Sequence, residues 1–114
     1  MVNEWKTFAG IRDDTAKRDK LFPGWLECVT VARQKIPPGA DLVFVSDVDE
    51  ERYSYLNYLL NYELYPLRHF HKVEYGYGIR PRFVLIYLGV PAGMKFEQYR
   101  QVHATANATL LEKR

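Results

Sequence analysis

The most regular hydrophobic pattern of the chain lies between residues 41 and 68. It opens with the apolar residues 42–45, a run too short for a buried helix and rich in strand-favouring side chains. Asp47 follows shortly after, and Glu50 stands three residues beyond it, a spacing that predicts a capped helix start. The helical period then continues until Pro66. A buried strand that leads into a capped helix predicts the first half of a β-α-β unit.

The helix predicted from Glu51 to Pro66 is apolar over most of its circumference. Its leucines form one arc, and an adjoining arc consists of Tyr55, Tyr58, Tyr62 and Tyr65. A helix of this kind is typically buried on two sides, which favours a core helix whose tyrosines pack against a neighbour. The alternative is a tyrosine surface that stacks on a ligand or binds a partner or a second copy of the chain.

The pattern predicts several further elements: a helix over about residues 23–35, strands over about 69–74 and 82–88, a short helix around 96–102, and an edge strand over about 107–112. Only about eight residues separate the two middle strands, so they form either an antiparallel hairpin or a crossing in extended form. The strand over 82–88 is the most hydrophobic run and predicts a central position. We expect Leu60 and Ile86 to be buried in one cluster.

These elements predict a compact three-layer, Rossmann-like α/β domain over residues 21–114, with a mixed sheet of about four strands and helices on both faces. Residues 1–20 are charged and weakly patterned and predict an amphipathic or linker segment. Trp5, Phe8 and Ile11 share one helical face there. We expect them to pack near Tyr58 and Tyr62, unless those rings form a surface for a partner.

Composition excludes several classes of protein. With 114 residues, of which 47% are hydrophobic and 15% aromatic, the chain has enough apolar surface for one core, so disorder is not the default expectation. The net charge of +2 is too balanced to favour nucleic acid or an anionic membrane. The single cysteine, Cys28, excludes an internal disulfide and a cysteine-based zinc site. The sequence shows neither a signal peptide nor an apolar run of about 20 residues.

Two histidines are candidate metal ligands. His69 and His71 flank Phe70 on a predicted strand, so both imidazoles would point to one face. Such a pair can bind zinc with Asp47 or Asp49 as a third ligand. Neither a helical histidine pair nor a cysteine supports this site, and the pattern favours one surface histidine and one packed at a strand end. We therefore expect no metal.

The first candidate ligand site is the end of the first predicted strand, where Ser46, Asp47 and Asp49 lie. Ligands of open α/β sheets bind outside the carboxyl ends of the strands, so this position suits a ligand. Carboxylates at a helix start also complement the helix dipole, and this structural role is favoured. The sequence lacks the Gly-x-Gly-x-x-Gly cradle of a dinucleotide site, so we expect no cofactor.

The second candidate ligand site is the loop that contains Tyr75 and Tyr77. It is bracketed by the basic side chains of Arg68, Lys72, Arg80 and Arg82. Such a mixture of tyrosine and arginine can hold a phosphate or stack on a base. No RNA-recognition signature accompanies the loop, so we expect no nucleic-acid partner. No nucleophile elbow and no His-Glu-x-x-His motif are present, so hydrolysis has no sequence support.

The order of four segments resembles a known family: "IPPGADLVFVSD", "YLNYLLNYELYPLRHF", "PRFVLIYLG" and "NATLLEKR". It is similar to the soluble domain that follows the last membrane helix in some bacterial polytopic glycosyltransferases of the GT-C, mannosyltransferase-like type. The resemblance covers roughly residues 21–114, and its distinctive part is the Tyr-x-Leu-Tyr-Pro turn with Arg68. The short interval after this turn and Leu111, where an aromatic residue is expected, depart from the family pattern.

The resemblance implies a non-catalytic, extracytoplasmic domain with a packing or recognition role, whose partner is the membrane portion of a longer parent protein. Catalytic acids of such enzymes lie in the membrane portion, so none is assigned in this chain. Two alternatives remain open. One is a free-standing cytoplasmic module that binds a small anionic ligand or sugar phosphate at Ser46, Asp47 and the tyrosine loop. The other is a metal-dependent enzyme around His69 and His71. The tyrosine-rich helix is also a candidate surface for homo-oligomers.

Overall fold

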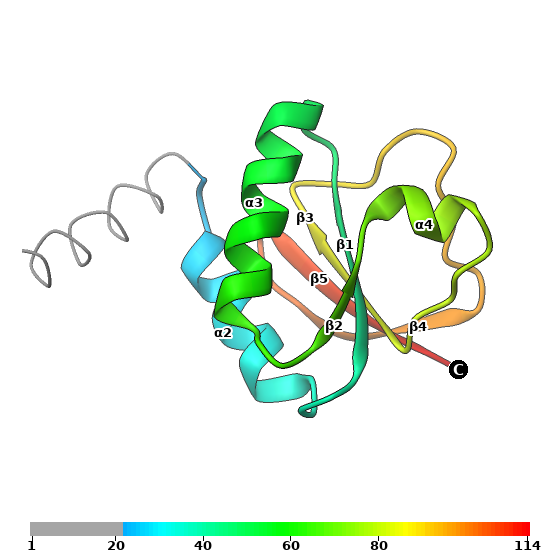
Figure 1. The fold of residues 1–114 in the computed structure, drawn as a ribbon, viewed down its shortest axis with the longest axis horizontal. Helices are drawn as coiled ribbons and strands as arrows, with labels where there is room; N and C mark the ends of the chain where they lie inside the picture. The colour runs from blue at the N-terminus through cyan, green and yellow to red at the C-terminus, as the bar shows by residue number, and fades with distance from the viewer. Residues whose placement is uncertain (1–21) are drawn as a thin grey trace, which may run out of the picture.

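The computed structural model describes residues 22–114, so the segment expected over residues 1–20 lies outside the described part. The elements are α2 (Trp25–Lys35), β1 (Asp41–Ser46), α3 (Glu50–Glu63), β2 (Arg68–Phe70), α4 (Lys72–Gly76), β3 (Phe83–Tyr87), β4 (Tyr99–Ala104) and β5 (Ala108–Lys113) (Figure 1). Helices α2 and α3 and strands β1 and β3 lie close to the bounds that the hydrophobic pattern predicts.

Five strands form one mixed sheet in the order β2-β1-β3-β5-β4. Strand β1 pairs in parallel with β2 on one side and with β3 on the other. Strand β5 is antiparallel to β3, and β4 is antiparallel to β5. The prediction of an α/β domain with a mixed sheet is confirmed. The expected number of about four strands was too low, and the last strand lies inside the sheet rather than at its edge.

The additional strand, β4, occupies the segment for which a helix was predicted. Tyr99 and Val102 are three residues apart, a spacing that fits a helix. A register shift between Gln101 and His103 bulges this strand against β5. Tyr99 is buried whereas Val102 is 39% exposed, so the two side chains do not share a buried face. Two apolar residues at this spacing therefore fit a bulged edge strand as well as a helix.

Strand β2 is shorter than predicted because His71 begins a helix. The Nδ1 atom of His71 accepts a hydrogen bond from the amide of Val73 at 3.2 Å, and Glu74 Oε2 accepts one from the amide of His71 at 2.6 Å. These two bonds form a capping box for α4. The strand predicted through Glu74 and the hairpin alternative were both wrong. Residues 71–82 instead cross β1 and lead to β3, with α4 in the connection.

The cap of helix α3 lies two residues later than predicted. Asp49, rather than Asp47, is the cap residue, and its Oδ1 accepts a hydrogen bond from the amide of Arg52 at 2.8 Å. The buried face of the helix contains Tyr53, Leu56, Leu59 and Leu60. The leucine arc therefore faces the sheet, as expected, and one tyrosine outside the predicted tyrosine arc joins it.

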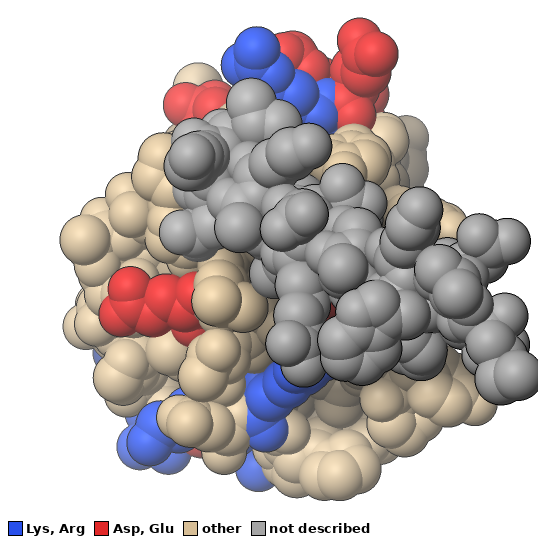
Figure 2. All heavy atoms as spheres, turned by 90° about the vertical axis from the view of Figure 1, so that its left-hand side faces the viewer, with Lys and Arg blue, Asp and Glu red and all other residues tan. Residues whose placement is uncertain are grey.

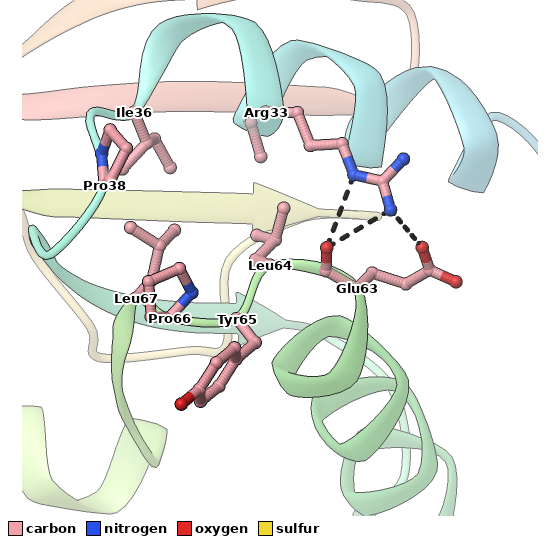
Figure 3. A pocket seen from close by; sticks show the side chains of 9 residues that line it. Arg33, Ile36, Pro38, Glu63, Leu64, Tyr65, Pro66 and Leu67 are labelled. Atoms are coloured by element: carbon pink, nitrogen blue, oxygen red, sulfur yellow. Dashed lines mark hydrogen bonds and ion pairs between the residues drawn. The ribbon is translucent and has the colours of Figure 1, made fainter.

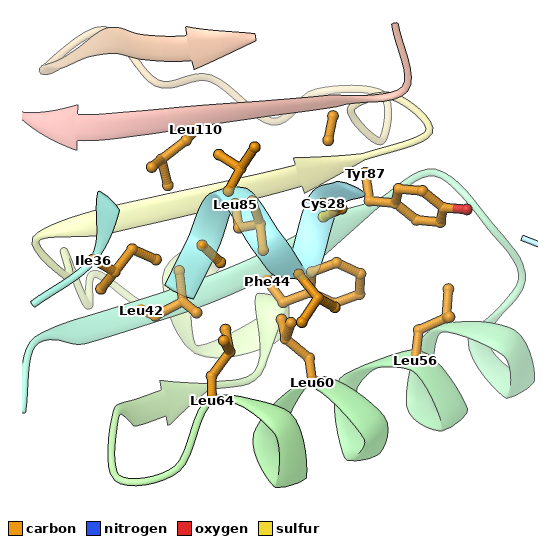
Figure 4. Close-up of a cluster of buried hydrophobic side chains, with 14 of the residues drawn as sticks. Cys28, Ile36, Leu42, Phe44, Leu56, Leu60, Leu64, Leu85, Tyr87 and Leu110 are labelled. Carbon is orange, nitrogen blue, oxygen red and sulfur yellow. The ribbon is translucent and has the colours of Figure 1, made fainter. Parts of the chain in front are cut away.

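The core consists of two clusters on opposite faces of the sheet. Helices α2 and α3 cover the larger cluster, which includes Leu42, Phe44, Leu60, Leu85, Tyr87 and Leu110 (Figure 4). The smaller cluster contains Val43, Val45, Val84 and Ile86, together with Tyr75 of α4 and Tyr99. Neighbouring strand residues point to opposite faces. Leu60 and Ile86 are both buried, as expected, but the expectation that they share one cluster was wrong.

Candidate functional site

The candidate ligand-binding residues at the end of β1 have structural roles in the fold. Ser46 is fully buried and lies two residues after Phe44, on the sheet face that the helices α2 and α3 cover. Asp47 and Asp49 are exposed. Asp49 caps α3 and its Oδ2 lies 3.5 Å from Arg52 Nε. The acidic cluster thus starts the helix, and the serine hydroxyl faces the protein interior.

The tyrosine loop is likewise built around internal contacts. Tyr75 is buried and donates its hydroxyl hydrogen to the Lys95 carbonyl at 2.7 Å. The guanidinium of Arg80 lies 4.2 Å from the centroid of the Tyr75 ring and donates to the Tyr75 carbonyl at 2.6 Å. Burial raises the pKa of the Tyr75 hydroxyl. Tyr77 is exposed and lies at the end of α4. Tyr75 is thus part of α4 and not of the predicted loop, and its contacts hold this helix against the sheet.

The two candidate ligand groups do not form a single site. Arg68 pairs in register with Asp41 at the beginning of the parallel strands, and its Nε lies 3.5 Å from Asp41 Oδ1. Ser46 pairs with Tyr87 at the opposite end of β1. Among the described residues visible in Figure 2, charged side chains occur in small separate groups between uncharged ones. Arg68 and Ser46 thus lie at opposite ends of β1, whereas Lys72 lies beside the acidic cluster, with its Nζ 3.4 Å from Glu50 Oε2.

The two histidines are also separated by the secondary structure. His71 caps α4, and its Nε2 lies 3.3 Å from Glu50 Oε1. His69 lies on β2, where both ring nitrogens are buried without a hydrogen-bond partner among the described residues. Burial lowers the pKa of His69 to about 4. Within residues 22–114, no group of three or more histidine, cysteine, aspartate or glutamate side chains is arranged to hold a metal ion.

Tyr53 forms a junction that the sequence pattern did not single out. Its hydroxyl donates to the Phe44 carbonyl at 2.7 Å and accepts from the Lys72 amide at 2.9 Å. The ring stacks on Phe44, with centroids 5.6 Å apart, and the Lys72 ammonium lies 4.1 Å from its centroid. One side chain thus joins β1, α3 and the start of α4. The spacing of Tyr53, Leu56 and Leu60 was the available sign that this tyrosine belongs to the buried arc.

The main outward-facing aromatic feature is what we call the tyrosine surface: Tyr55, Tyr58 and Tyr62 of α3 and Tyr65 just after it. The relative exposures of these four residues are 44%, 70%, 78% and 83%. Three of them and Asn61 line an open hollow of about 390 Å³. Within residues 22–114, the expected packing against a neighbour is present only at Tyr55, whose ring centroid lies 6.1 Å from that of Phe22. The sequence alternative of an exposed tyrosine surface describes this part better.

A second hollow of about 180 Å³ adjoins the tyrosine surface, and Tyr65 borders both (Figure 3). It lies between the end of α2 and the turn after α3, where Ile36, Leu64 and Leu67 provide apolar side chains. An ion pair between Arg33 Nη2 and Glu63 Oε2, 2.5 Å apart, stands at its rim. The surface thus combines exposed aromatic rings, an amide and an apolar recess.

Comparison with protein-family models, with curated proteins and with solved structures gave no match. In the part of the chain that the structure describes, no helix is long and apolar enough to cross a membrane.

Proposed function

We propose that this chain is a non-catalytic packing or recognition domain of a membrane glycosyltransferase-like protein and lies on the extracytoplasmic side. The observation that carries the packing or recognition role is the tyrosine surface, where uncharged aromatic side chains lie exposed beside an apolar recess. The membrane parent and the location follow from the sequence resemblance. The partner in this proposal is the membrane portion of the parent protein.

The chemistry of tyrosine supports a contact surface. A tyrosine ring offers a large apolar area with few rotatable bonds, and its hydroxyl remains able to form hydrogen bonds, so tyrosine is common in protein interfaces. Catalysis instead needs a nucleophile or base that is oriented towards a site for the reacting atom. The buried hydroxyls of Tyr53, Tyr75, Tyr87 and Tyr99 all donate to backbone carbonyls and so serve the fold.

The proposal extends to the architecture. We describe the domain as a three-layer, Rossmann-like arrangement, and the support for it is the parallel set β2-β1-β3 with α3 and α4 in its two connections. The antiparallel strands β5 and β4 then extend this set on one side. The sugar-phosphate module and the metal-dependent enzyme draw no comparable support from the positions of their residues.

Cell fractionation tests the proposal. An antibody raised against this domain should detect a polypeptide much larger than 13.4 kDa in the membrane fraction of the source cells. Protease added outside spheroplasts should remove the epitope, while a cytoplasmic marker protein stays intact. Detection of a 13.4 kDa polypeptide in the soluble fraction would refute the membrane parent. Protection from the external protease would refute the extracytoplasmic location.

A further inference from the structure

We propose that the end of the sheet where β3 and β4 begin and β5 ends binds the surface of a membrane that carries anionic phospholipids. We call this region the basic end, and it consists of Arg80, Arg82, Arg100 and Lys113. The inference goes beyond the role of the tyrosine surface, because it concerns other residues and another partner. Only the choice of a membrane among anionic partners rests on the proposed function.

The strand register brings the residues of the basic end together. Arg100 of β4 pairs with Glu112 of β5, and Glu112 also pairs with the first residue of β3, which Arg82 directly precedes. Lys113 follows Glu112 along β5, and its amide donates to the Arg82 carbonyl at 2.8 Å. Neighbouring strands lie about 5 Å apart. Three of them therefore present basic side chains side by side, at the end of the sheet where the C-terminus lies in Figure 1.

Two guanidinium groups of the basic end share one carboxylate. Arg82 Nη2 lies 3.1 Å from Glu112 Oε2, and Arg100 Nη2 lies 2.9 Å from Glu112 Oε1. The hydrogen bond from Arg100 lowers the pKa of Glu112, so this carboxylate is ionised at neutral pH and offsets one of the two cations. The side chains of Arg82 and Arg100 are 56% and 64% exposed. Both are therefore open to an anion outside the protein.

The other two cations bring the excess of positive charge to three. Lys113 is exposed and forms no ion pair with another described residue. Arg80 is also exposed, and its guanidinium donates to the Tyr75 carbonyl at 2.6 Å, which holds this charge in place. Lys95 and Glu97, in the loop before β4, carry opposite charges and leave the excess unchanged.

Acidic side chains gather at the opposite end of the sheet, where α3 begins. They follow the end of β1: Asp47, Asp49, Glu50 and Glu51. Strand β1 is parallel to β3 and has six residues, so its two ends lie about 17 Å apart at 3.3 Å per residue. The Debye length at physiological salt is about 8 Å. A membrane that touches the basic end is therefore largely screened from the acidic end. The nearly balanced net charge of the chain conceals this separation.

This distribution of charge suits a planar anionic surface better than other anionic partners. Each Lys or Arg near such a surface strengthens binding about fivefold, whereas an exposed ion pair between two proteins contributes little. A second copy would have to place its acidic end on the basic end, and such a head-to-tail contact leaves both outer ends unpaired. The rings of Tyr75 and Tyr99, which pack beside the basic end, are buried and offer no face on which a base can stack.

Sedimentation of the purified full chain with lipid vesicles tests this inference. The vesicles contain phosphatidylglycerol and phosphatidylcholine in equal parts, and vesicles of phosphatidylcholine alone are the uncharged comparison. The test variant is Arg100→Gln, and the matched control is Arg52→Gln. The two arginine side chains are 64% and 67% exposed, and each pairs with a carboxylate. The variants have the same net charge, so they differ in the end of the sheet that loses a cation.

We expect the wild-type chain to bind the anionic vesicles and not the uncharged ones. Arg100→Gln should weaken this binding about fivefold, and Arg52→Gln should change it less than about twofold, because Arg52 lies at the far end. Glu112→Gln removes the one carboxylate of the basic end and should strengthen binding about fivefold, an increase limited to anionic vesicles. This gain separates the role of charge from a loss caused by poor folding.

Two results would overturn the inference: no binding to the anionic vesicles, or equal effects of Arg100→Gln and Arg52→Gln. Release by inorganic phosphate, but not by sodium chloride of the same ionic strength, would assign the basic end to a free phosphate instead. Tighter binding to a single-stranded oligonucleotide than to the vesicles would assign it to nucleic acid. The vesicles contain no parent protein and the fractionation uses whole cells, so either proposal can fail alone.

Discussion

Replacing Tyr53 by phenylalanine removes one hydroxyl group from the junction of β1, α3 and α4. That hydroxyl is fully buried and takes part in two hydrogen bonds, one to the Phe44 carbonyl and one from the Lys72 amide. A hydrogen bond contributes about 0.5–1.5 kcal/mol net, and a buried group that loses its partner costs about 1–3 kcal/mol. Lys72 is the first residue of α4, where helix amides have no partner within the helix. We therefore expect Tyr53→Phe to lower the free energy of unfolding by about 1–3 kcal/mol.

The assay is urea unfolding at pH 7, combined with amide hydrogen exchange. The matched control is Tyr62→Phe, which removes a hydroxyl from a residue that is 78% exposed and should change stability by less than about 0.5 kcal/mol. The amide of Lys72 should exchange faster in Tyr53→Phe than in the control, because only the former removes its acceptor. Equal stabilities of the two variants, or unchanged exchange at Lys72, would refute the role assigned to this hydroxyl.

Three further predictions concern the core, pH and metal. Leu60→Ala should lower the free energy of unfolding by about 2–5 kcal/mol, because this side chain is fully buried on the sheet-facing side of α3; a thermal melt like that of the wild type would refute its placement. Burial lowers the pKa of His69 from 6.5 in the unfolded chain to about 4 in the folded chain. As pH falls, the unfolded chain therefore binds a proton first. The stability that the neutral imidazole contributes is present above pH 6.5 and is lost as pH falls towards about 4. In urea titrations His69→Gln should therefore lose less stability than the wild type over this interval, and parallel curves would contradict this. Elemental analysis of untagged protein should find no stoichiometric zinc, and one equivalent that is lost on changing His69 and His71 would contradict the non-enzymatic role.

Local sequence patterns predicted those helices and strands whose conformation is determined by residues nearby in the sequence. The apolar run of β1, the helix that follows it and the buried strand β3 each had an unambiguous period and a clear end. Strand β2 was extended too far because histidine is not among the usual helix caps, so the capping box of His71 and Glu74 was missed. Strand β4 was missed because the three-residue spacing of Tyr99 and Val102 also fits a helix.

The position of each strand in the sheet could not be predicted from local patterns. Strand β5 reads as an edge because its sequence is only half apolar, yet it lies between β3 and β4. The strands that flank β5 in the sheet are determined by pairing between segments distant in the sequence. Such pairing leaves no recognisable hydrophobic period in the sequence of the strand itself.

The candidate site was predictable only in outline. The tyrosine arc was visible as a pattern, but a pattern does not say whether a ring is covered. Tyr53 differs from the other tyrosines only in the direction in which it leaves the helix. Ser46 and the loop at Tyr75 suited ligands by residue type, whereas the strand alternation and the contacts of α4 directed both residues inwards.

The form of the two outer strands restricts how this domain can join other molecules. Strand β2 offers only three residues for main-chain pairing, and the bulge at Gln101 and His103 interrupts the ladder along β4. Short or bulged outer strands are poor templates for an added strand. Extension of the sheet into a neighbouring chain is therefore disfavoured at both ends. Under the proposed packing role, attachment to a neighbour would rely on side chains instead, and association would be sensitive to single substitutions on the helical face rather than to backbone register.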